Sequence, residues 1–405
     1  MSWQIVKLSS IFEIARGGSP RPISEFITDD PNGLNWISIK DASNSEKYIT
    51  KTKQKIREEG LAKSRLVKPG DFLLTNSMSF GRPYIMKTTG CIHDGWLVLS
   101  GDKKKVDQDY FYHLLGSEEM HLKFSRLAAG AVVKNLNIDL VKNVEICLPP
   151  LAEQKKIAAI LDAADQLRQK DQQLIDHYTS LSQSLFLEMF GDPVSNPMGF
   201  AISKLSNAYV SSKDATKCGP FGSALKKDEY VENGVPVWVM DNIRKSEFVF
   251  DNSLFITPEK YEKLEAYSTQ SGDIIISRAG TVGKMCIIPE GYSRAIISTN
   301  LIRLRLNADI LLPIYFVLLM EFFGDRVGRM RTGPDGAFTH MNTGVLNNLE
   351  FPFPPIEKQL YFSKYLSSIE SQKDKARHAM VESETLFNSL LQRAFKGELT
   401  SSKAA

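Results

Sequence analysis

The sequence predicts an α+β protein: two pseudo-symmetric α/β domains, separated by two long helices that pack as an antiparallel coiled coil. Three observations predict this fold class. A motif at residues 135–154 recurs at 340–359, 205 residues later. Short strand-like runs bounded by glycines precede each copy, and a long amphipathic stretch follows each copy. A repeat of this length implies two copies of one domain and hence a pseudo-twofold arrangement.

The motif keeps polar and apolar positions between its two copies. The first copy is NLNIDLVKNVEICLPPLAEQ and the second is HMNTGVLNNLEFPFPPIEKQ. The identical pairs are Asn137/Asn342, Asn143/Asn348, Glu145/Glu350, Pro149/Pro354, Pro150/Pro355 and Gln154/Gln359. We therefore expect the two domains to end in the same local structure.

Upstream of the motif, each domain contains a strand–loop–strand pattern. KPGDFLLTNSMSFGRPYIM (68–86) matches QSGDIIISRAGTVGKMCII (270–288) at an offset of 202 residues. In both segments, Gly-Asp begins an apolar run, and a small polar loop leads to a glycine and a second apolar run. The domains begin near Lys7 and Lys204, at an offset of 197, so they differ by small insertions in loops.

Two stretches without glycine or proline, 153–190 and 357–396, each follow a Pro-Pro pair and end near a glycine. Their apolar spacing predicts two long amphipathic helices. The predicted seam residues are Ile157, Ile160, Ala164, Leu167, Leu174, Tyr178, Leu181 and Leu185 in the first, and Phe362, Tyr365, Ile369, Gln372, Ala376, Ala379, Leu386 and Leu390 in the second. A lone helix would expose such a stripe, so we expect the two to pack together, with polar Asp171, Gln372 and Ser383 in the seam. Two unrelated surface helices are the alternative.

The predicted order is therefore domain, helix, domain, helix. The predicted boundaries are 1–149 for the first domain, 150–192 for the central helix, 193–353 for the second domain and 354–398 for the C-terminal helix. Antiparallel helices would place the two domains at opposite ends of a rod.

Composition limits the class of protein. The chain has 405 residues, a hydrophobic fraction of 42% and a net charge of +3, so any basic surface must be local. Its four cysteines form no CxxC pair, which favours a reducing compartment. The start lacks a signal-peptide pattern, and no apolar run is long enough to cross a membrane. We expect a cytoplasmic protein with no membrane partner.

The sequence also argues against catalysis by this chain. NPMGF (196–200) is similar to a methyltransferase tetrapeptide, but it lacks the second proline and has no glycine-rich cofactor motif beside it. RAGTVGKM (278–285) has Arg and Met where a phosphate-binding loop needs Gly and Ser/Thr. The six histidines have no metal-ligand spacing. We expect no catalytic residue, no bound metal and no bound cofactor.

Polar and basic loops interrupt the strand-like runs of both domains. Such side chains suit DNA, because Arg and Asn bond base edges and Lys or Arg neutralises phosphate. The candidate DNA-binding residues are Ser79, Arg82, Lys134, Asn135, Arg278, Thr281, Lys284, Arg329, Arg331 and His340. For any single residue, an ordinary solvated turn remains the alternative.

Together these features resemble the specificity subunit (HsdS) of type I restriction-modification enzymes, over essentially the whole chain. The segments that carry the resemblance are LPPLAEQKKIAAILD (148–162), FPPIEKQ (353–359), GPFGSALK (219–226), SGDIIISRAGTVGK (271–284) and PGDFLLTNSMSFGRPYI (69–85). The first domain has ARGGSPRP (15–22) where the second has GPFGS, as expected if the two domains recognise different sequences.

The resemblance implies that each domain is a target recognition domain for one half of a split asymmetric sequence in double-stranded DNA. It implies that the long helices set the spacing between the half-sites and bind two methyltransferase subunits, which restriction subunits join. S-adenosylmethionine, ATP and Mg would then belong to the partner subunits. The candidate partner-binding residues are Ile157, Ile160, Leu167, Leu181, Leu185, Phe362, Ile369, Leu386 and Leu390.

Two other hypotheses compete with this one, and the first of them fails. A single-chain enzyme with its own methyltransferase would need a catalytic module, for which the sequence has no room. A coiled-coil scaffold that joins two protein-binding domains fits the same helices. Salt-dependent binding to a split DNA site would exclude the scaffold.

Overall fold

The structure is a computed structural model that describes most of the chain. It describes residues 3–43, 45–76, 81–129, 136–211, 213–221, 224–244, 247–250, 254–278, 283–292, 294–332 and 342–400, with only the backbone for 325–332. The chain forms two compact units. The first unit contains residues 1–173 and 376–405, and the second contains residues 174–375. Each unit thus contains one part of both long helices.

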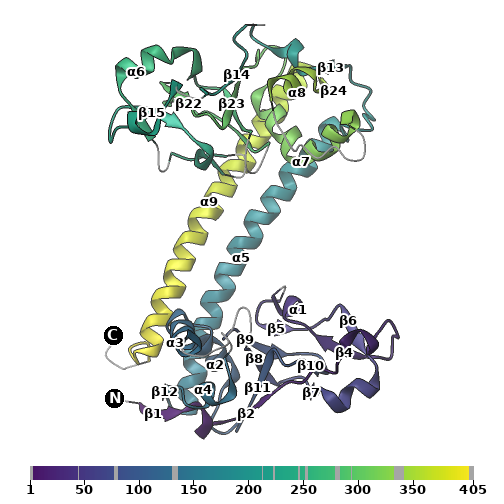
Figure 1. Cartoon of the computed structure of the whole chain (residues 1–405), viewed down its shortest axis with the longest axis vertical. Coiled ribbons are helices and arrows are strands. Elements are labelled where there is room, and N and C mark those ends of the chain that lie inside the picture. Colours follow the sequence, from purple (N-terminus) through teal and green to yellow (C-terminus); the bar gives the residue numbers. More distant parts are fainter. Residues whose placement is uncertain are drawn as a thin grey trace. The chain divides into compact units, whose positions relative to one another are not determined.

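The elements follow one another along the chain as Figure 1 labels them. The first unit contains β1 (Gln4–Lys7), β2 (Phe12–Arg16), β3 (Ile27–Thr28), β4 (Leu34–Ile37), α1 (Ile39–Ser43), β5 (Tyr48–Ile49), β6 (Gln54–Ile56), β7 (Arg65–Val67), β8 (Phe72–Thr75), β9 (Pro83–Met86), β10 (Gly90–Ile92), β11 (Trp96–Gly101), α2 (Gln108–Leu115), α3 (Glu118–Ala129), α4 (Ile138–Lys142) and β12 (Glu145–Leu148). Helix α5 (Leu151–Phe190) then continues into the second unit.

The second unit repeats this order in outline, again with twelve strands among the described residues. It contains β13 (Ile202–Lys204), β14 (Thr216–Cys218), β15 (Val235–Trp238), β16 (Ile243–Arg244), β17 (Glu247–Phe248), β18 (Leu254–Ile256), α6 (Pro258–Lys263), β19 (Ser268–Thr269), β20 (Ile274–Ser277), β21 (Met285–Ile287), β22 (Ala295–Ile297), β23 (Leu301–Leu304), α7 (Pro313–Thr332), α8 (Thr343–Asn348) and β24 (Glu350–Pro352). Helix α9 (Ile356–Phe395) begins here and ends in the first unit.

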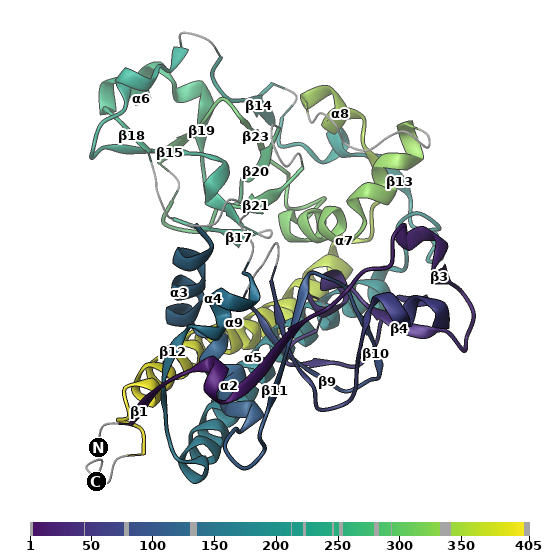
Figure 2. The same ribbon diagram turned by 60° about the horizontal axis from the view of Figure 1, so that its bottom comes forward.

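Two mixed or antiparallel sheets form the globular part of each unit. In the first unit the strand orders are β3-β6-β4-β10-β7 and β2-β11-β8-β9-β5, and Figure 2 shows β4 beside β10. In the second unit they are β18-β15-β22-β19 and β14-β23-β20-β21. A separate pair of strands, β1-β12 or β13-β24, brings the start of each domain to its repeated motif.

The strand pairing confirms that the two domains are copies of one fold. Ile5 lies opposite Cys147 in the first unit, and Ile202 lies opposite Pro352 in the second, at the offsets of 197 and 205 that the sequence gives. The pairs β2-β11 and β14-β23 also have the same register once their offsets of 202 and 205 are applied. The predicted fold class is therefore confirmed at the level of individual residue pairs.

The central strands of both units are buried on both faces, which explains why they are continuous apolar runs rather than alternating ones. In β8, Phe72 and Leu74 belong to one hydrophobic cluster and Leu73 to another. In β20, Ile274 and Ile276 face one cluster and Ile275 the other. Because successive side chains of a strand point to opposite faces, a sheet covered on both sides needs an apolar residue at every position.

A buried glutamine explains the Pro-Pro-(Leu/Ile)-x-x-Gln motif at the start of each long helix. Gln154 is fully buried; its Nε2 donates to the carbonyls of Lys105 and Pro149 (2.9 Å each), and its Oε1 accepts from Asp107 N (2.9 Å). Every group of the side chain is thus paired inside the fold. The motif therefore ties the first turn of α5 to the loop before α2.

Gln359 makes the same three bonds in the second unit. Its Nε2 donates to the carbonyls of Ile310 (3.1 Å) and Pro354 (2.8 Å), and its Oε1 accepts from Leu312 N (2.8 Å). All of these partners lie 205 residues after those of Gln154. The expectation that the two domains end in the same local structure is therefore confirmed, and this pair of glutamines is its structural cause.

Helices α5 and α9 pack against each other in antiparallel orientation, as predicted. In the first unit, the guanidinium of Arg168 lies over the ring of Phe387, 5.1 Å from its centroid. In the second unit, Phe190 at the end of α5 packs against Phe362 near the start of α9, with ring centroids 5.1 Å apart. Early residues of one helix therefore meet late residues of the other (Figure 1).

The seam between the helices differs in part from the predicted one. Ile157, Ala164, Phe362 and Ala376 are buried, as are the polar Asp171 and Ser383. Tyr178, Leu185, Ile369, Ala379 and Leu390 are half-buried. The seam prediction was wrong for Ile160, Leu167, Leu174, Leu181, Tyr365, Gln372 and Leu386, which are exposed.

The error has a simple physical origin in α5. The helix carries two apolar stripes: one passes through Leu161 and Phe186, which are fully buried, and the other through Leu167 and Leu181. Periodicity detects a stripe but does not say which of two stripes faces the neighbouring helix. Here the stripe that contains Asp171 is buried, although it is the less apolar of the two.

The domain boundaries predicted at residues 149, 192 and 353 stay a prediction, because the two units divide each long helix between them. Among the described residues, no helix is both long and apolar enough to cross a membrane.

Candidate nucleic-acid interface

Three loops of each domain come together at one end of the sheet that contains β8 or β20. The first loop cluster consists of residues 17–22, 76, 81–82 and 93–95, and the second loop cluster consists of residues 219–221, 278, 283–284 and 298–300. Each contains the segment after β2 or β14, the loop after β8 or β20, and the turn before β11 or β23. Residues 17–22 and 219–221 thus occupy equivalent places, although their sequences do not match.

A glycine holds the first segment of each cluster against the third. Gly17 N donates to the carbonyl of Trp96 (3.0 Å), and Gly219 N donates to that of Leu301 (2.9 Å). A Cβ at Gly17 would lie 2.2 Å from the carbonyl oxygen of His93, and one at Gly219 would lie 1.9 Å from that of Ser298. Only glycine permits so close an approach of two backbones.

The loops after β8 and β20 also close in the same way. Gly81 N donates to Thr75 O (2.7 Å) and Gly283 N to Ser277 O (2.9 Å), with φ values of +82° and +85°. Both glycines thus have the left-handed backbone that other residues rarely adopt. As a result Asn76 corresponds to Arg278, and Arg82 corresponds to Lys284.

The first loop cluster is organised around Asp94. Its carboxylate accepts from Ser19 Oγ (2.8 Å) and Arg21 Nη2 (3.2 Å), and its carbonyl accepts from Arg16 Nε (2.7 Å) and Asn76 Nδ2 (3.0 Å). The hydrogen bond from Ser19 outweighs the effect of burial and, with the charge of Arg16, holds the pKa of Asp94 below its usual value. The carboxylate is therefore charged at neutral pH and pairs with Arg21, whose side chain is exposed.

The second loop cluster has different side chains at the same places. Phe221 stands where the first cluster has Ser19, Arg278 where it has Asn76, and Thr299 where it has Asp94. The Arg278 guanidinium lies over the Phe221 ring, 4.7 Å from its centroid, and the ring is 56% exposed. An aromatic and cationic pair thus replaces the carboxylate-centred network.

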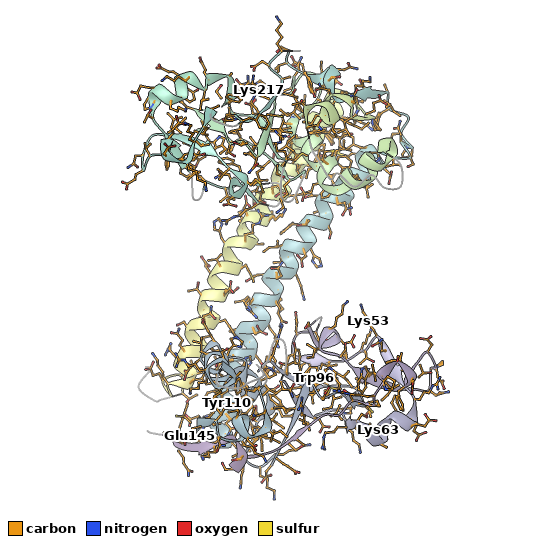
Figure 3. All side chains as sticks on the ribbon, viewed as in Figure 1. Lys53, Lys63, Trp96, Tyr110, Glu145 and Lys217 are labelled. Atoms are coloured by element: carbon orange, nitrogen blue, oxygen red, sulfur yellow. The ribbon has the colours of Figure 1, made fainter. Side chains whose placement is uncertain are left out.

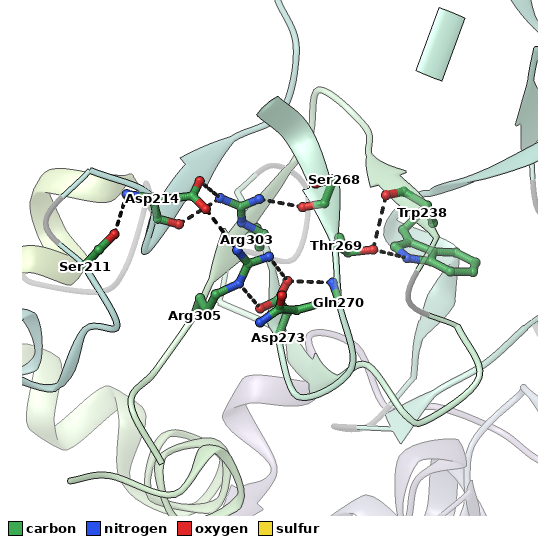
Figure 4. A network of polar contacts seen from close by, with 10 residues as sticks. Ser211, Asp214, Trp238, Ser268, Thr269, Gln270, Asp273, Arg303 and Arg305 are labelled. Atoms are coloured by element: carbon green, nitrogen blue, oxygen red, sulfur yellow. Dashed lines mark hydrogen bonds and ion pairs between the residues drawn. The ribbon is translucent and has the colours of Figure 1, made fainter. Parts of the chain in front are cut away.

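The second unit also contains a network of charged residues in and beside strands β20 and β23 (Figure 4). Arg303 in β23, only 1% exposed, bonds Asp214 Oδ1 (2.5 Å) and Ser268 O (2.5 Å). Arg305 bonds both oxygens of the fully buried Asp273 (2.7 and 2.8 Å). The hydrogen bonds that Arg305 donates to Asp273 outweigh burial and raise the pKa of Arg305. The first unit has Val98 and Ser100 at the positions of the two arginines.

Three of the predicted DNA-binding residues belong to these clusters. Arg82 and Lys284 are exposed, the former with its guanidinium 5.6 Å from the ring centroid of Tyr84, and Arg278 is partly exposed. Ser79, Lys134, Asn135, Thr281 and His340 lie outside the described residues, and so do the side chains of Arg329 and Arg331 on α7. Contact with DNA stays a prediction for all ten.

Sequence reasoning missed Ser19, Asn76, Asp94 and Phe221. The 202-residue offset pairs Asn76 with Arg278, so the sequence alone could have found Asn76. Ser19, Asp94 and Phe221 needed the pairing of β2 with β11 and of β14 with β23, because the loop sequences do not align.

A second candidate surface lies on the long helices. Ile160, Leu167, Leu174 and Leu181 follow one another at steps of seven along α5 and are 37%, 45%, 44% and 49% exposed. Residues seven apart lie on nearly the same face of a helix. Helix α9 likewise exposes large apolar side chains: Leu360, Tyr361, Tyr365, Val381 and Leu386. Other residues of the predicted partner-binding set have less exposed area, and Ile157 and Phe362 have none.

Tyr110, labelled in Figure 3, shows how the first domain meets the end of α9: its ring packs edge-on against Phe395, with centroids 5.9 Å apart. Within the part of the chain that the structure describes, no group of three or more His, Cys, Asp or Glu side chains could hold a metal ion.

Comparisons with known proteins all point to the same family. A family model described as the Type I restriction modification DNA specificity domain matches residues 1–176 and 220–382. The specificity subunit of type I restriction enzyme MjaVIII from Methanocaldococcus jannaschii is 22% identical over 384 residues, which cover 91% of this chain and 86% of that protein. The EcoBI specificity subunit from Escherichia coli is 20% identical over 426 residues, or 98% of this chain and 86% of that protein.

Solved structures agree on the fold. The S subunit of a type I restriction-modification system from M. genitalium has a TM-score of 0.57 at 15% identity and covers 98% of this chain and 96% of that one. A chain solved in work on complex assembly and conformational transition of the type I R-M system has a TM-score of 0.55 at 17% identity, with 98% of both chains covered. The duplicated domain, the paired long helices and the family match lead to one conclusion: this chain belongs to the family of type I restriction-modification specificity subunits, HsdS.

Proposed function

We propose that this chain determines the DNA sequence specificity of a type I restriction-modification complex, and that each domain recognises one half of a bipartite, asymmetric target. One observation carries the proposal. Equivalent backbone contacts hold the loop clusters of both domains, yet Ser19, Asn76 and Asp94 in one cluster correspond to Phe221, Arg278 and Thr299 in the other. Two copies of one fold with unlike side chains at equivalent loop positions suit a target with two unlike halves.

The repeated parts of the chain support the binding of two identical partners. The motif with Gln154 or Gln359 has the same hydrogen bonds in both units, so a partner would meet the same local structure twice. On α5, the exposed stripe from Ile160 to Leu181 is apolar surface that the fold does not cover. We assign this stripe to contact with methyltransferase subunits, of which the complex would hold two.

In this proposal the chain itself performs no chemistry. The complex would methylate adenine in its target and, with restriction subunits, cleave DNA with ATP. S-adenosylmethionine, ATP and Mg would be bound by those partner subunits, in the cytoplasm.

The test is methylome sequencing of a host that expresses this chain with its methyltransferase. The expected result is methylation at one split, asymmetric motif. Replacing residues 1–149 with the first domain of another family member should change one half of that motif and leave the other half unchanged. A chain without the exchange, expressed beside it, is the control.

Two results would contradict the proposal. If no split motif is methylated, or if the exchange changes both halves, the domains do not recognise separate half-sites. Binding of the purified complex to a duplex with the motif should also weaken steeply as salt rises. A coiled-coil scaffold for proteins would show neither the motif nor the salt dependence.

A further inference from the structure

We propose that Arg278, held over the ring of Phe221, forms a guanine-binding site in the second domain. The inference rests on the proposed function and adds to it the kind of base recognised and the residues that recognise it. It concerns only side chains of the second loop cluster that the structure describes.

The position of Phe221 is fixed by bonds on both sides of its loop. Gly219 N donates to the carbonyl of Leu301 (2.9 Å), and Thr299 Oγ1 donates to the carbonyl of Pro220 (2.7 Å). Ala224 N in turn donates to the carbonyl of Phe221 (3.2 Å). With its backbone held this way and more than half its surface exposed, the ring is a fixed apolar plane at the surface of the domain.

The backbone of Arg278 is fixed as well, while its guanidinium is not fully bonded. Arg278 N donates to the carbonyl of Asn300 (3.0 Å). Its Nη1 is buried and has no hydrogen-bond partner among the described residues. A buried donor without a partner is unfavourable and unusual in native proteins. The guanidinium therefore gains a bond if it turns toward an acceptor, and the Phe221 ring beside it limits where it can move.

Guanine is the base that fits this pair. Its O6 and N7 are two acceptors on one edge in the major groove, and an arginine bonds both at once. A guanidinium that lies over an aromatic ring has fewer orientations open to it, which favours such a two-fold contact. The first domain has Asn76 at this position, with its Nδ2 donating to Asp94, so the same contact is not available there.

Phosphate offers oxygen acceptors too, and the experiment separates the two cases. A phosphate contact strengthens binding to every sequence equally, whereas a base contact favours one base at one position. Lysine at position 278 would keep the positive charge that a phosphate contact needs. It would lose the planar guanidinium that donates two hydrogen bonds to one base.

The test compares methylomes for the wild-type chain and for Arg278→Ala, Arg278→Lys and Phe221→Leu, each expressed with its methyltransferase. The wild-type half-site of the second domain should contain a guanine at which Arg278→Ala lowers discrimination about 5- to 150-fold. Arg278→Lys should relax the same position, and Phe221→Leu should relax it about 2- to 5-fold. The half-site of the first domain should not change.

A matched control exists in the same unit. Arg294 lies over the ring of Tyr261, 5.4 Å from its centroid, outside the second loop cluster. Arg294→Ala should leave the recognised sequence as it is. Thermal unfolding of each purified variant checks that the fold is kept, and Phe221→Leu is the variant least able to disturb it because the ring is exposed.

Three results would overturn the inference: an unchanged motif in the Arg278 variants, an even loss of methylation over all positions, or a second half-site without guanine. A wild-type chain that supports no split motif would instead overturn the proposed function.

Discussion

The two domains have the same backbone arrangement but bury different chemistry at equivalent positions. In the first unit, Val98 of β11 packs in an apolar cluster with Trp96. In the second unit, the residue at that position is Arg303, which is 1% exposed and bonded to Asp214 and Ser268. The fold thus tolerates an apolar or a charged residue in one strand, provided that neighbouring residues have changed with it.

The loop clusters differ by the same rule. Gly17 and Gly219, Gly81 and Gly283 are kept because the backbone contacts need them. The side chains around Asp94 and around Arg278 are not kept. The comparison separates residues that hold the shared backbone in place from residues that differ between the two units. Four predictions test this separation.

Exchanging Val98 of β11 and Arg303 of β23 should have the largest effect on the free energy of unfolding. Val98→Arg would bury an unpaired charge in the first unit, where no carboxylate takes the place of Asp214, and should lower the free energy of unfolding by more than about 4 kcal/mol. Arg303→Val should cost less, about 1–3 kcal/mol, because Asp214 stays bonded to Arg305 and is half exposed. Denaturant unfolding measures both, with Val98→Ile as the control. Equal losses would contradict the idea that neighbours compensate.

Removing the shared glutamine should affect the two units alike. Gln154→Ala and Gln359→Ala each remove three hydrogen bonds from buried groups, so each should lower the free energy of unfolding by about 3 kcal/mol. The control is Gln372→Ala on the exposed face of α9, for which we expect less than about 0.5 kcal/mol. A large effect at only one of the two sites would show that the motif is not equivalent in the two units.

A carboxylate of α5 should make the first unit sensitive to acid. Asp162 accepts from His113 Nε2 (2.7 Å) and Lys47 Nζ (2.8 Å), and Lys47 also pairs with Asp109 (2.7 Å). Burial raises the pKa of Asp162, but the bonds from His113 and Lys47 outweigh it and hold that pKa below its usual value. The second unit has Ser367 at this position.

The direction of the pH dependence follows from the lowered pKa of Asp162. The carboxylate stabilises the fold above its unfolded-state pKa, and this contribution is lost as pH falls through the folded-state value. Asp162→Asn should therefore cost about 2 kcal/mol at pH 7 and almost nothing in strong acid. Denaturant unfolding at both pH values measures it, and Ser367→Ala is the control. An equal loss at both pH values would contradict an ionic role.

The smallest effect on stability should come from the exposed stripe of α5. Leu167→Ser and Leu174→Ser remove side chains that are 45% and 44% exposed, so we expect less than about 0.5 kcal/mol each. Co-purification of a tagged methyltransferase subunit should nevertheless drop. Leu161→Ser, in the buried stripe, is the matched contrast, with a loss of several kcal/mol, on the order of 3. Unchanged co-purification for the exposed pair would remove the stripe from the partner surface.

The sequence by itself determined the duplication, the two long helices and the loops that contain Arg82, Arg278 and Lys284, because these follow from repeated spacing and from turn-forming glycines. Tertiary structure alone decided which stripe of α5 is buried. Leu161 and Leu167 are the same residue type, and only their surroundings distinguish them: Leu161 belongs to the hydrophobic core of the first unit, whereas Leu167 is 45% exposed. It also decided that Ser19 and Phe221 are equivalent, because strand pairing aligns loops whose sequences do not match. Local pattern fixes what a segment can form; long-range packing selects which of its faces and side chains are used.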